Sequence, residues 1–314
     1  GVPTGFRDMD NILAGWQRSD LVILAARPAM GKTAVALNFA HNVAVKAEQP
    51  VLLFSLEMSK EQLVDRLLAM ESGVDAWNIR TGNLSDADFE KIGNAMGALS
   101  EAPIYIDDTP GITISEMRTK ARREQHQRQL GLIIVDYLQL MSGSADRNSN
   151  REQEISKISR DLKSLAKELQ VPIIALSQLS REVEKRKEGN KMPQLSDLRE
   201  SGAIEQDADM VMFLYRPEYY EINQNEFGEN NKGETHVKIA KHRNGSLETI
   251  KLRAQLHIQK FVEDNSDDSP FSALPKEGGN WRPVSELGGG DDARMFIQKG
   301  SKMNDGEFDD DMPN

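Results

Sequence analysis

The segment from Ala26 to Thr33 constrains the fold and chemistry of this chain more than any other. It reads Ala-Arg-Pro-Ala-Met-Gly-Lys-Thr, follows the apolar run Leu21–Ala25 and leads into an Ala-rich stretch that extends to about Ala47. The run is typical of a buried parallel strand and the stretch of a helix. A loop that opens a helix directs N–H groups and the positive end of the helix dipole at an anion. The segment therefore predicts a phosphate-binding loop.

The end of this loop carries the charge chemistry. Gly31 lets the backbone approach a phosphate, Lys32 can reach β- and γ-phosphates, and the Thr33 hydroxyl can ligate Mg²⁺. The usual pattern has glycine at the first position, where this chain has Ala26. Gly-Lys-Thr also occurs by chance in loops, but the flanking strand and helix favour the phosphate loop. The expected nucleotide contacts of the loop are Ala29, Gly31, Lys32, Thr33 and Ala34.

The composition is that of a soluble globular protein. Hydrophobic residues make up 38% of the 314 residues, and no apolar run approaches the length of a membrane span. The chain has no cysteine, which excludes disulfides and thiolate metal sites and permits a cytoplasmic location. No signal peptide is apparent. We therefore expect a cytoplasmic protein with no membrane partner.

The negative charge is concentrated at one end of the chain. The net charge is −11, and residues 264–314 carry seven of these negative charges. Net negative charge argues against nucleic-acid binding. Residues 1–263, however, have nearly equal numbers of acidic and basic side chains and can still place a basic stripe inside a channel. The end segment is rich in Asp, Gly, Pro and Ser, which predicts disorder. We expect one globular domain over 1–263 and an acidic, disordered tail over 264–314.

Apolar runs alternate with helical segments through most of the chain. Three helices begin with capping boxes, at Ser59 with Gln62, Ser85 with Asp88, and Thr113 with Glu116, and a long charged helix covers about 150–169. This alternation predicts an α/β fold with a mainly parallel sheet flanked by helices on both faces. The expected parallel strands are Leu21–Ala25, Val51–Leu56, Pro103–Asp107, Leu132–Val135, Val171–Leu176 and Met210–Leu214.

The pattern changes after residue 235. Three short stretches alternate apolar and polar residues, which predicts antiparallel strands added to one edge of the sheet. These stretches are His236–Ala240, Thr249–Arg253 and His257–Val262.

Polar residues that follow the apolar strands are candidates for chemistry, because the ligand of such a sheet binds beyond the carboxyl ends of its strands. Asp136 follows Leu132–Val135 and can support Mg²⁺ opposite Thr33; its alternative role is an ordinary turn aspartate. Glu57 follows Val51–Leu56 and can deprotonate a water that attacks a γ-phosphate. Its alternative role is to help begin the next helix.

Three further features have weaker local signals. Gln178, after the strand that begins near Val171, can sense a γ-phosphate by hydrogen bonding, or it is a surface turn residue. The segment 195–202 contains Arg199 and follows a basic loop; it can bind nucleic-acid phosphates, or it is a solvated charged face. The segment Lys241–Gly245 ends in Asn-Gly and predicts a hairpin turn, whose cations can reach a neighbouring subunit's γ-phosphate or simply face solvent.

Taken in order, these segments closely resemble the C-terminal motor domain of the DnaB family of bacterial replicative DNA helicases. The resemblance covers about residues 1–263, and Ala26 in place of the first glycine is typical of that family. Several ordered motifs are far more specific than any one. The matching segments are Gly1–Phe6, Ala26–Thr33, Phe54–Ser59, Val135–Leu140, Ala175–Arg181, Arg199–Gly202 and Ile239–Gly245.

The resemblance implies a RecA-like P-loop NTPase core that assembles as a ring hexamer and uses ATP to move along single-stranded DNA and unwind duplex. It assigns ATP and Mg²⁺ binding to Lys32 and Thr33, water activation to Glu57, metal support to Asp136, and coupling of hydrolysis to motion to Gln178. The remaining assignments are Arg66 near the nucleotide, Lys241, His242 and Arg243 contacting ATP from the adjacent subunit, and Arg199, Glu200 and Gly202 contacting DNA.

The resemblance also bears on partners. The full family protein has an N-terminal helical domain and a linker helix, and we expect this chain to be the motor portion of such a protein. A primase and a helicase loader are expected partners of the full-length protein. The rival interpretations are a RecA-type recombinase, a clock-type ring ATPase, a small-molecule kinase and a nucleotide-gated interaction module.

Overall fold

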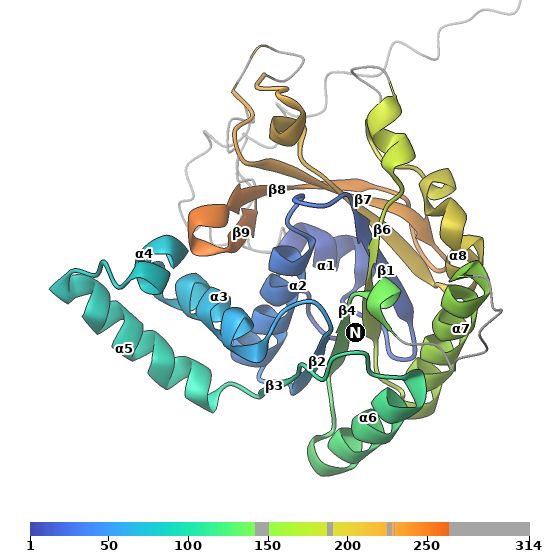
Figure 1. Cartoon of the computed structure of the whole chain (residues 1–314), viewed down its shortest axis with the longest axis horizontal. Helices are drawn as coiled ribbons and strands as arrows, with labels where there is room; N and C mark the ends of the chain where they lie inside the picture. Colours follow the sequence, from blue (N-terminus) through green and yellow to red (C-terminus); the bar gives the residue numbers. More distant parts are fainter. Residues whose placement is uncertain (142–150, 187–190, 225–227, 229, 264–314) are drawn as a thin grey trace, which may run out of the picture. The chain divides into compact units, whose positions relative to one another are not determined.

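The computed structural model describes residues 1–141, 151–186, 191–224, 228 and 230–263 (Figure 1). The side chains of residues 151–152 and 199–202 lie outside this described set. The predicted acidic tail, residues 264–314, also lies outside it. Residues Gly1–Asn265 form one compact unit.

A nine-stranded sheet runs through this unit in the order β3-β2-β4-β5-β1-β6-β7-β8-β9. The first six strands of the chain pair in parallel, and β7, β8 and β9 are added as antiparallel strands at the β6 edge. The predicted mainly parallel sheet with antiparallel edge strands is therefore confirmed. The strands are β1 Leu21–Ala26, β2 Val51–Ser55, β3 Ile104–Asp107, β4 Leu132–Asp136, β5 Ile173–Gln178, β6 Met210–Tyr215, β7 Glu234–His242, β8 Thr249–Gln255 and β9 Lys260–Glu263.

Helices cover both faces of the sheet, and none in the described residues is long and apolar enough to cross a membrane. All three predicted capping boxes are present, at the starts of α3, α5 and α6. The α-helices are α1 Arg7–Leu13, α2 Lys32–His41, α3 Lys60–Ser72, α4 Ala76–Thr81, α5 Asp86–Glu101, α6 Ile114–Arg128, α7 Arg151–Leu169 and α8 Gly202–Asp207. The shorter helices are η1 Asn42–Lys46, η2 Leu138–Leu140, η3 Arg181–Lys185, η4 Leu195–Ser201, η5 Pro217–Tyr220 and η6 Leu256–Ile258.

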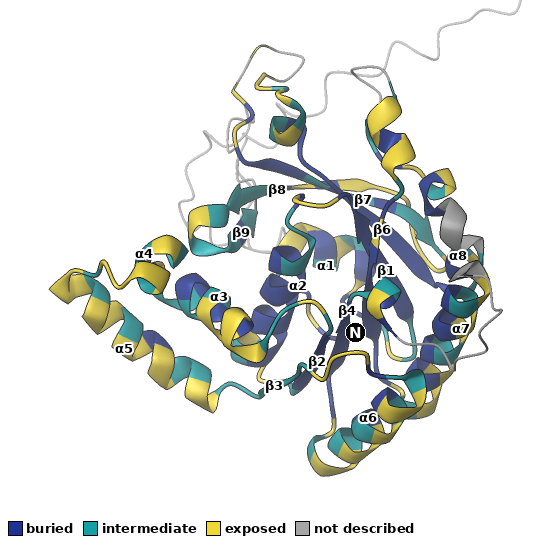
Figure 2. Ribbon diagram, viewed as in Figure 1, coloured by how far each residue is buried: buried dark blue, intermediate teal, exposed yellow. Residues whose placement is uncertain are grey.

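Alternate residues of each central strand face opposite layers of the core. In β1, Val22 and Leu24 pack with α2 and α3, whereas Leu21 and Ile23 pack with α6 and α7. Because both faces of the sheet are covered, β1, β2, β4 and β6 are buried along their whole length (Figure 2). This double coverage explains why the sequence of these strands is continuously apolar rather than alternating.

Three predicted elements differ from the structure. The strand expected over Val171–Leu176 is β5, Ile173–Gln178, so Gln178 is its last residue. The helix expected from Thr33 to about Ala47 is α-helical only to His41 and continues as the π-helix η1. The strand expected over His257–Val262 begins only at Lys260. Leu256–Ile258 instead forms the 3₁₀ helix η6, which ends at Gln259 in a left-handed conformation with φ 56°. An alternating pattern over so few residues does not distinguish this turn from a strand.

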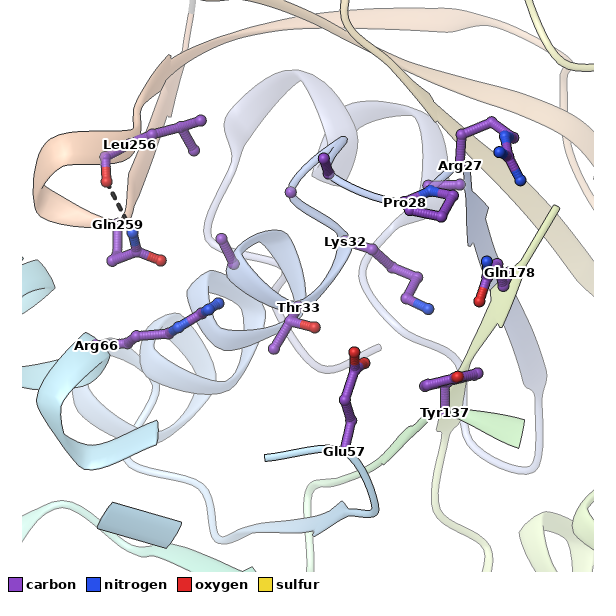
Figure 3. A pocket seen from close by; sticks show the side chains of 14 residues that line it. Arg27, Pro28, Lys32, Thr33, Glu57, Arg66, Tyr137, Gln178, Leu256 and Gln259 are labelled. Atoms are coloured by element: carbon purple, nitrogen blue, oxygen red, sulfur yellow. Dashed lines mark hydrogen bonds between the residues drawn. The ribbon is translucent and has the colours of Figure 1, made fainter. Parts of the chain in front are cut away.

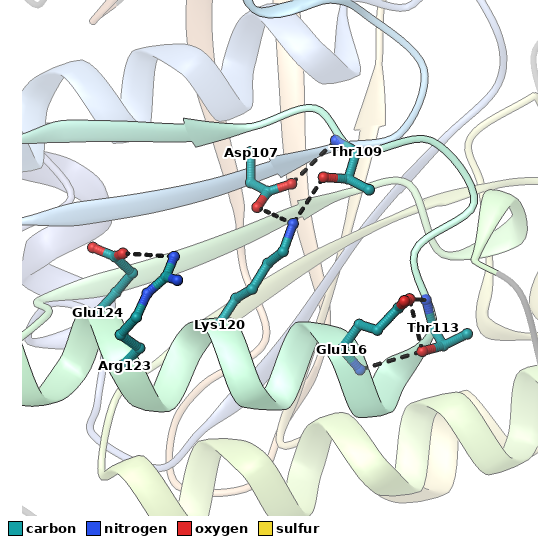
Figure 4. A network of polar contacts seen from close by, with 7 residues as sticks. All are labelled: Asp107, Thr109, Thr113, Glu116, Lys120, Arg123 and Glu124. Atoms are coloured by element: carbon teal, nitrogen blue, oxygen red, sulfur yellow. Dashed lines mark hydrogen bonds and ion pairs between the residues drawn. The ribbon is translucent and has the colours of Figure 1, made fainter.

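A polar network fixes α6 below the edge strand β3 (Figure 4). The Lys120 ammonium donates to Asp107 Oδ2 at 2.6 Å and to the Thr109 hydroxyl at 2.8 Å. At the start of α6, Thr113 and Glu116 satisfy each other's backbone N–H groups. The Lys120 contacts hold α6 against the end of β3, and the Thr113–Glu116 pair caps the start of the helix.

Asn38, on α2, attaches the end of the antiparallel extension to this helix. Its amide nitrogen donates to the carbonyl of Gln259 at 3.0 Å, and its amide oxygen accepts from the N–H of Phe261 at 3.0 Å. The Asn38 side chain is buried. One amide therefore holds η6 and β9 against the helix that follows the phosphate loop.

We expect Asn38→Ala to reduce the free energy of unfolding by about 2–4 kcal/mol, because two buried backbone groups lose their partners. Urea denaturation measures this loss, and amide exchange at Phe261 localises it. Asn42→Ala is the matched variant, because Asn42 donates instead to Thr4. An unchanged Phe261 exchange rate in Asn38→Ala would show that β9 is held by other contacts.

Candidate functional site

The phosphate loop connects β1 to α2, and it has a glycine where its backbone is left-handed. Gly31 immediately precedes α2 and has φ 90°, a left-handed conformation that glycine adopts without strain. A Cβ at Gly31 would also lie 3.3 Å from the Phe261 ring. The first turn of α2 contains no acidic residue that would oppose an anion bound at the helix N–H groups.

The pairing register of the strands brings the predicted polar residues together at the carboxyl ends of the parallel strands. Ala26 pairs with Gln178, and Ser55 pairs with Asp136. Glu57 follows Ser55 by two residues, at the turn after β2. Residues that are far apart in the sequence therefore converge on the phosphate loop.

Figure 3 shows these residues around one pocket. Lys32, Thr33 and Glu57 point into it from three directions, with Gln178 on one side and Arg66 on the other. The structure thus brings together these predicted residues that line the pocket: Ala29, Gly31, Lys32, Thr33, Ala34, Glu57, Arg66 and Gln178.

Asp136 lies just behind the pocket, against Thr33. Its Oδ2 accepts a hydrogen bond from the Thr33 hydroxyl at 2.7 Å. Its Oδ1 is buried and has no hydrogen-bond partner among the described residues. A carboxylate oxygen and a hydroxyl are ligands that suit Mg²⁺, which keeps several waters and takes few protein ligands. The pair therefore fits this ion, although no cluster of three or more His, Cys, Asp or Glu residues that could hold a metal occurs in the described residues.

Burial perturbs the two central charges of the site in opposite directions. Burial lowers the pKa of Lys32, and the nearby carboxylates of Asp136 and Glu57 oppose this shift. Burial raises the pKa of Asp136, and the Lys32 ammonium and the Thr33 hydrogen bond oppose that shift. Lys32 Nζ also lies 4.3 Å from the centre of the Tyr137 ring. The pKa of each of these groups is therefore set by burial and by the opposing charge of its neighbours.

Part of the pocket lining was not predicted from the sequence. Tyr137 follows Asp136 directly, and Arg27 and Pro28 lie within the loop itself, so all three could have been found by position. Leu256 and Gln259 belong to η6 and its end, and no local signal connects them to a phosphate loop; Asn38 brings them there. The lining residues that were not predicted as contacts are Ala26, Arg27, Pro28, Tyr137, Leu256 and Gln259.

Lys241, His242 and Arg243 do not line this pocket. They lie at the end of β7 and in the turn after it, where Lys241 donates to the carbonyl of Glu205. Arg243 donates to the carbonyl of Gln206 at 2.8 Å and lies 3.5 Å from an Asp209 carboxylate oxygen. Both cations therefore contact backbone carbonyls at the carboxyl end of α8.

The predicted DNA-contacting residues fall at a junction between two helices. Arg199 and Glu200 are in η4, and Gly202 begins α8. Their side chains lie outside the described residues. The basic loop before them, residues 187–190, lies outside as well.

Comparison with known proteins identifies what this domain is similar to. The family model described as the DnaB-like helicase C terminal domain matches residues 1–263. The replicative DNA helicase DnaC of Bacillus subtilis is 54% identical over 271 residues, which cover 86% of this chain and 58% of that protein. The replicative DNA helicase DnaB of Geobacillus stearothermophilus is 54% identical over 262 residues, which cover 83% and 56%. The chain therefore spans little more than half the length of these relatives.

Solved structures with the same fold agree with this similarity. One of them, described as an ATPase domain, superposes with a TM-score of 0.78 at 40% identity, covering 84% of this chain and 91% of that one. A DnaB-like replicative helicase, solved in a study of its interactions with primase, has the same TM-score and identity and covers 84% and 62%.

We expect ATP affinity, measured by calorimetry without divalent ions, to fall as pH rises through the lowered Lys32 pKa. Below that pKa Lys32 is protonated and makes its full contribution to ATP affinity. Above it the Kd for ATP rises about tenfold per pH unit, because the protonated fraction of Lys32 declines. Glu57→Gln removes a carboxylate that raises the Lys32 pKa. The alkaline fall should therefore move to lower pH in Glu57→Gln and stay unchanged in the control Glu61→Gln. Coincident profiles for all three proteins would contradict this electrostatic account.

Proposed function

This chain belongs to the DnaB-like helicase C-terminal domain family, and from that membership we propose that it is the ATP-hydrolysing motor of a replicative DNA helicase. The motor is assigned to residues 1–263, and the tail is given no role. The observation that carries the proposal is the convergence of Lys32, Glu57 and Gln178 on one pocket at the start of α2. This arrangement suits hydrolysis of a nucleoside triphosphate.

ATP is the proposed substrate. The N–H groups at the start of α2 and the Lys32 ammonium bind its β- and γ-phosphates. Thr33 and Asp136 would hold Mg²⁺, which supplies neutralisation of phosphate charge when bound. The nucleoside end would extend toward Gln259, on the opposite side of the pocket from Gln178.

Glu57 is the proposed general base. It is exposed to the pocket at the turn after β2, and it accepts a proton from the water that attacks the γ-phosphate. Gln178 ends β5 and hydrogen-bonds the γ-phosphate through its neutral amide. The loss of that phosphate then releases Gln178, and β5 leads directly into η3.

Lys241, His242 and Arg243 are proposed to act on the nucleotide of an adjacent copy. Their position outside their own pocket supports this role, since cations that contribute to catalysis must reach a phosphate. Such a shared site requires an assembly in which each copy completes its neighbour. A homohexameric ring is the assembly that we propose.

Single-stranded DNA is the proposed track, held through its phosphates by Arg199, Glu200 and Gly202. Contacts to phosphates rather than base edges allow movement over any sequence. For the longer protein we propose a primase and a helicase loader as further partners, and the cytoplasmic replication fork as the location. A solved DnaB-like helicase studied with primase supports the first of these partners.

We expect Arg243→Ala to hydrolyse ATP slowly when alone and to recover activity when mixed with Lys32→Ala. Their defects lie on opposite sides of a shared site, so mixed assemblies contain some intact sites. Lys251→Ala, which removes an exposed cation from the adjacent strand β8, is the control and should retain full activity. ATPase assays over a series of mixing ratios measure the recovery. Activity that follows the simple average of the two variants would exclude a role for Arg243 in trans.

A further inference from the structure

Arg27 of the phosphate loop makes buried polar contacts that the proposed chemistry does not use. Its Nη1 donates to the carbonyl of Leu179 at 2.7 Å. Its Nε and Nη2 both donate to Oε1 of Glu184, at 2.9 and 2.7 Å. The Arg27 side chain is only 7% exposed. The loop that binds phosphate is therefore attached to η3, the short helix that follows β5.

The geometry of this ion pair favours a strong contact. Two donors of one buried guanidinium share a carboxylate oxygen of Glu184, whose side chain is 38% exposed, and such charge-assisted hydrogen bonds are stronger than neutral ones. An exposed ion pair in the same helix, Glu182 with Lys185, has side chains that are 61% and 72% exposed. Such an exposed pair contributes little to the free energy of unfolding, because solvent screens its charges. Within η3, then, Glu184 is the carboxylate that reaches the phosphate loop.

A second ion pair, buried on its Asp197 side, lies directly beyond η3. Arg186, directly after η3, donates to the carboxylate of Asp197 and to the carbonyl of Met192 at 3.3 Å. The other oxygen of Asp197 accepts from the N–H of Gln194 at 2.7 Å. The Asp197 side chain is 3% exposed. Asp197 lies in η4, the helix that contains Arg199 and Glu200.

The backbone at the end of η3 links the two ion pairs, because Glu184 and Arg186 are two residues apart. The connection runs from Arg27 to Glu184, along this backbone to Arg186, and across to Asp197, two residues before Arg199. Arg186 and Asp197 are 11 positions apart in the sequence. The two pairs therefore join the phosphate loop to η4, the helix assigned to DNA, through side-chain contacts.

We propose that Glu184 and Asp197 are positioning residues that couple nucleotide binding at the phosphate loop to DNA binding at η4. The inference rests on the proposed function, because it requires a DNA contact in η4. Nucleotide and DNA each favour one position of η3 and η4, which the two ion pairs join. Each ligand therefore changes the affinity of the other by the same factor. Neither residue touches the nucleotide pocket, and their role is to transmit rather than to bind.

The test compares ssDNA affinity with and without a non-hydrolysable ATP analogue, using labelled oligonucleotide and the full chain. We expect the analogue to change the Kd for DNA about fivefold or more in the unmodified protein, the lower end of usual coupling between sites. In Glu184→Ala we expect less than about a twofold change, with the KM for ATP and DNA-free turnover retained. Glu184→Gln keeps an acceptor for Arg27 and should restore part of the effect.

Two comparisons separate transmission from a merely structural role. Glu182→Ala removes a carboxylate from the same helix and should leave the coupling factor unchanged. Asp197→Ala should lose coupling as Glu184→Ala does, and the double variant should lose no more, because both act on one path. A structural defect would lower the melting temperature without changing the coupling factor.

The outcomes distinguish this inference from the proposed function. A coupling factor that persists in Glu184→Ala, or that is absent from an unmodified chain that binds both ligands, overturns the inference alone. Failure of the unmodified chain to bind ssDNA or to hydrolyse ATP overturns the proposed function, and the inference with it.

Discussion

The anion site at the start of α2 is the constraint on which the rest of the structure depends. The central strand β1 lies between β5 and β6 and delivers the chain to Gly31, whose left-handed backbone begins the helix. Unpaired N–H groups at that point favour a negative ligand. The parallel register of β2, β4 and β5 then brings Glu57, Asp136 and Gln178 to the same edge. The sheet thus positions chemical groups that no single segment could hold together.

Opposite charges in this site partly offset the effect of burial on each other's pKa. Burial disfavours the charged forms of both Lys32 and Asp136, and each of them opposes the shift of the other. Arg66 experiences the same balance, because burial lowers its pKa and Asp136 and Glu57 oppose the lowering. A bound triphosphate adds negative charge near Lys32 and Arg66 and further favours their protonated forms. Nucleotide binding and the charge state of the pocket are therefore linked.

Local patterns were sufficient to predict the elements and most of the pocket. The apolar strands and capping boxes are read within a few residues, and the carboxyl ends of parallel strands meet by geometry, which placed Glu57, Asp136 and Gln178 near Lys32. Contacts between distant segments could not be read this way. Arg27 meets Glu184 across 157 positions, and Gln259 reaches the pocket because Asn38 holds the end of η6. The roles of Arg199 and Arg243 rest on the family resemblance. Arg199 would act on DNA and Arg243 on an adjacent copy of the chain, and the sequence of one chain shows neither partner.

ATP turnover measured against protein concentration, with and without single-stranded DNA, tests the central claim most directly. A ring motor with shared sites predicts that specific activity rises steeply with concentration and is further stimulated by DNA. Glu57→Gln should still bind ATP and should show no turnover under any of these conditions, which makes it the matched blank. Specific activity that is independent of concentration and indifferent to DNA would contradict the account of this chain as a ring-forming DNA motor.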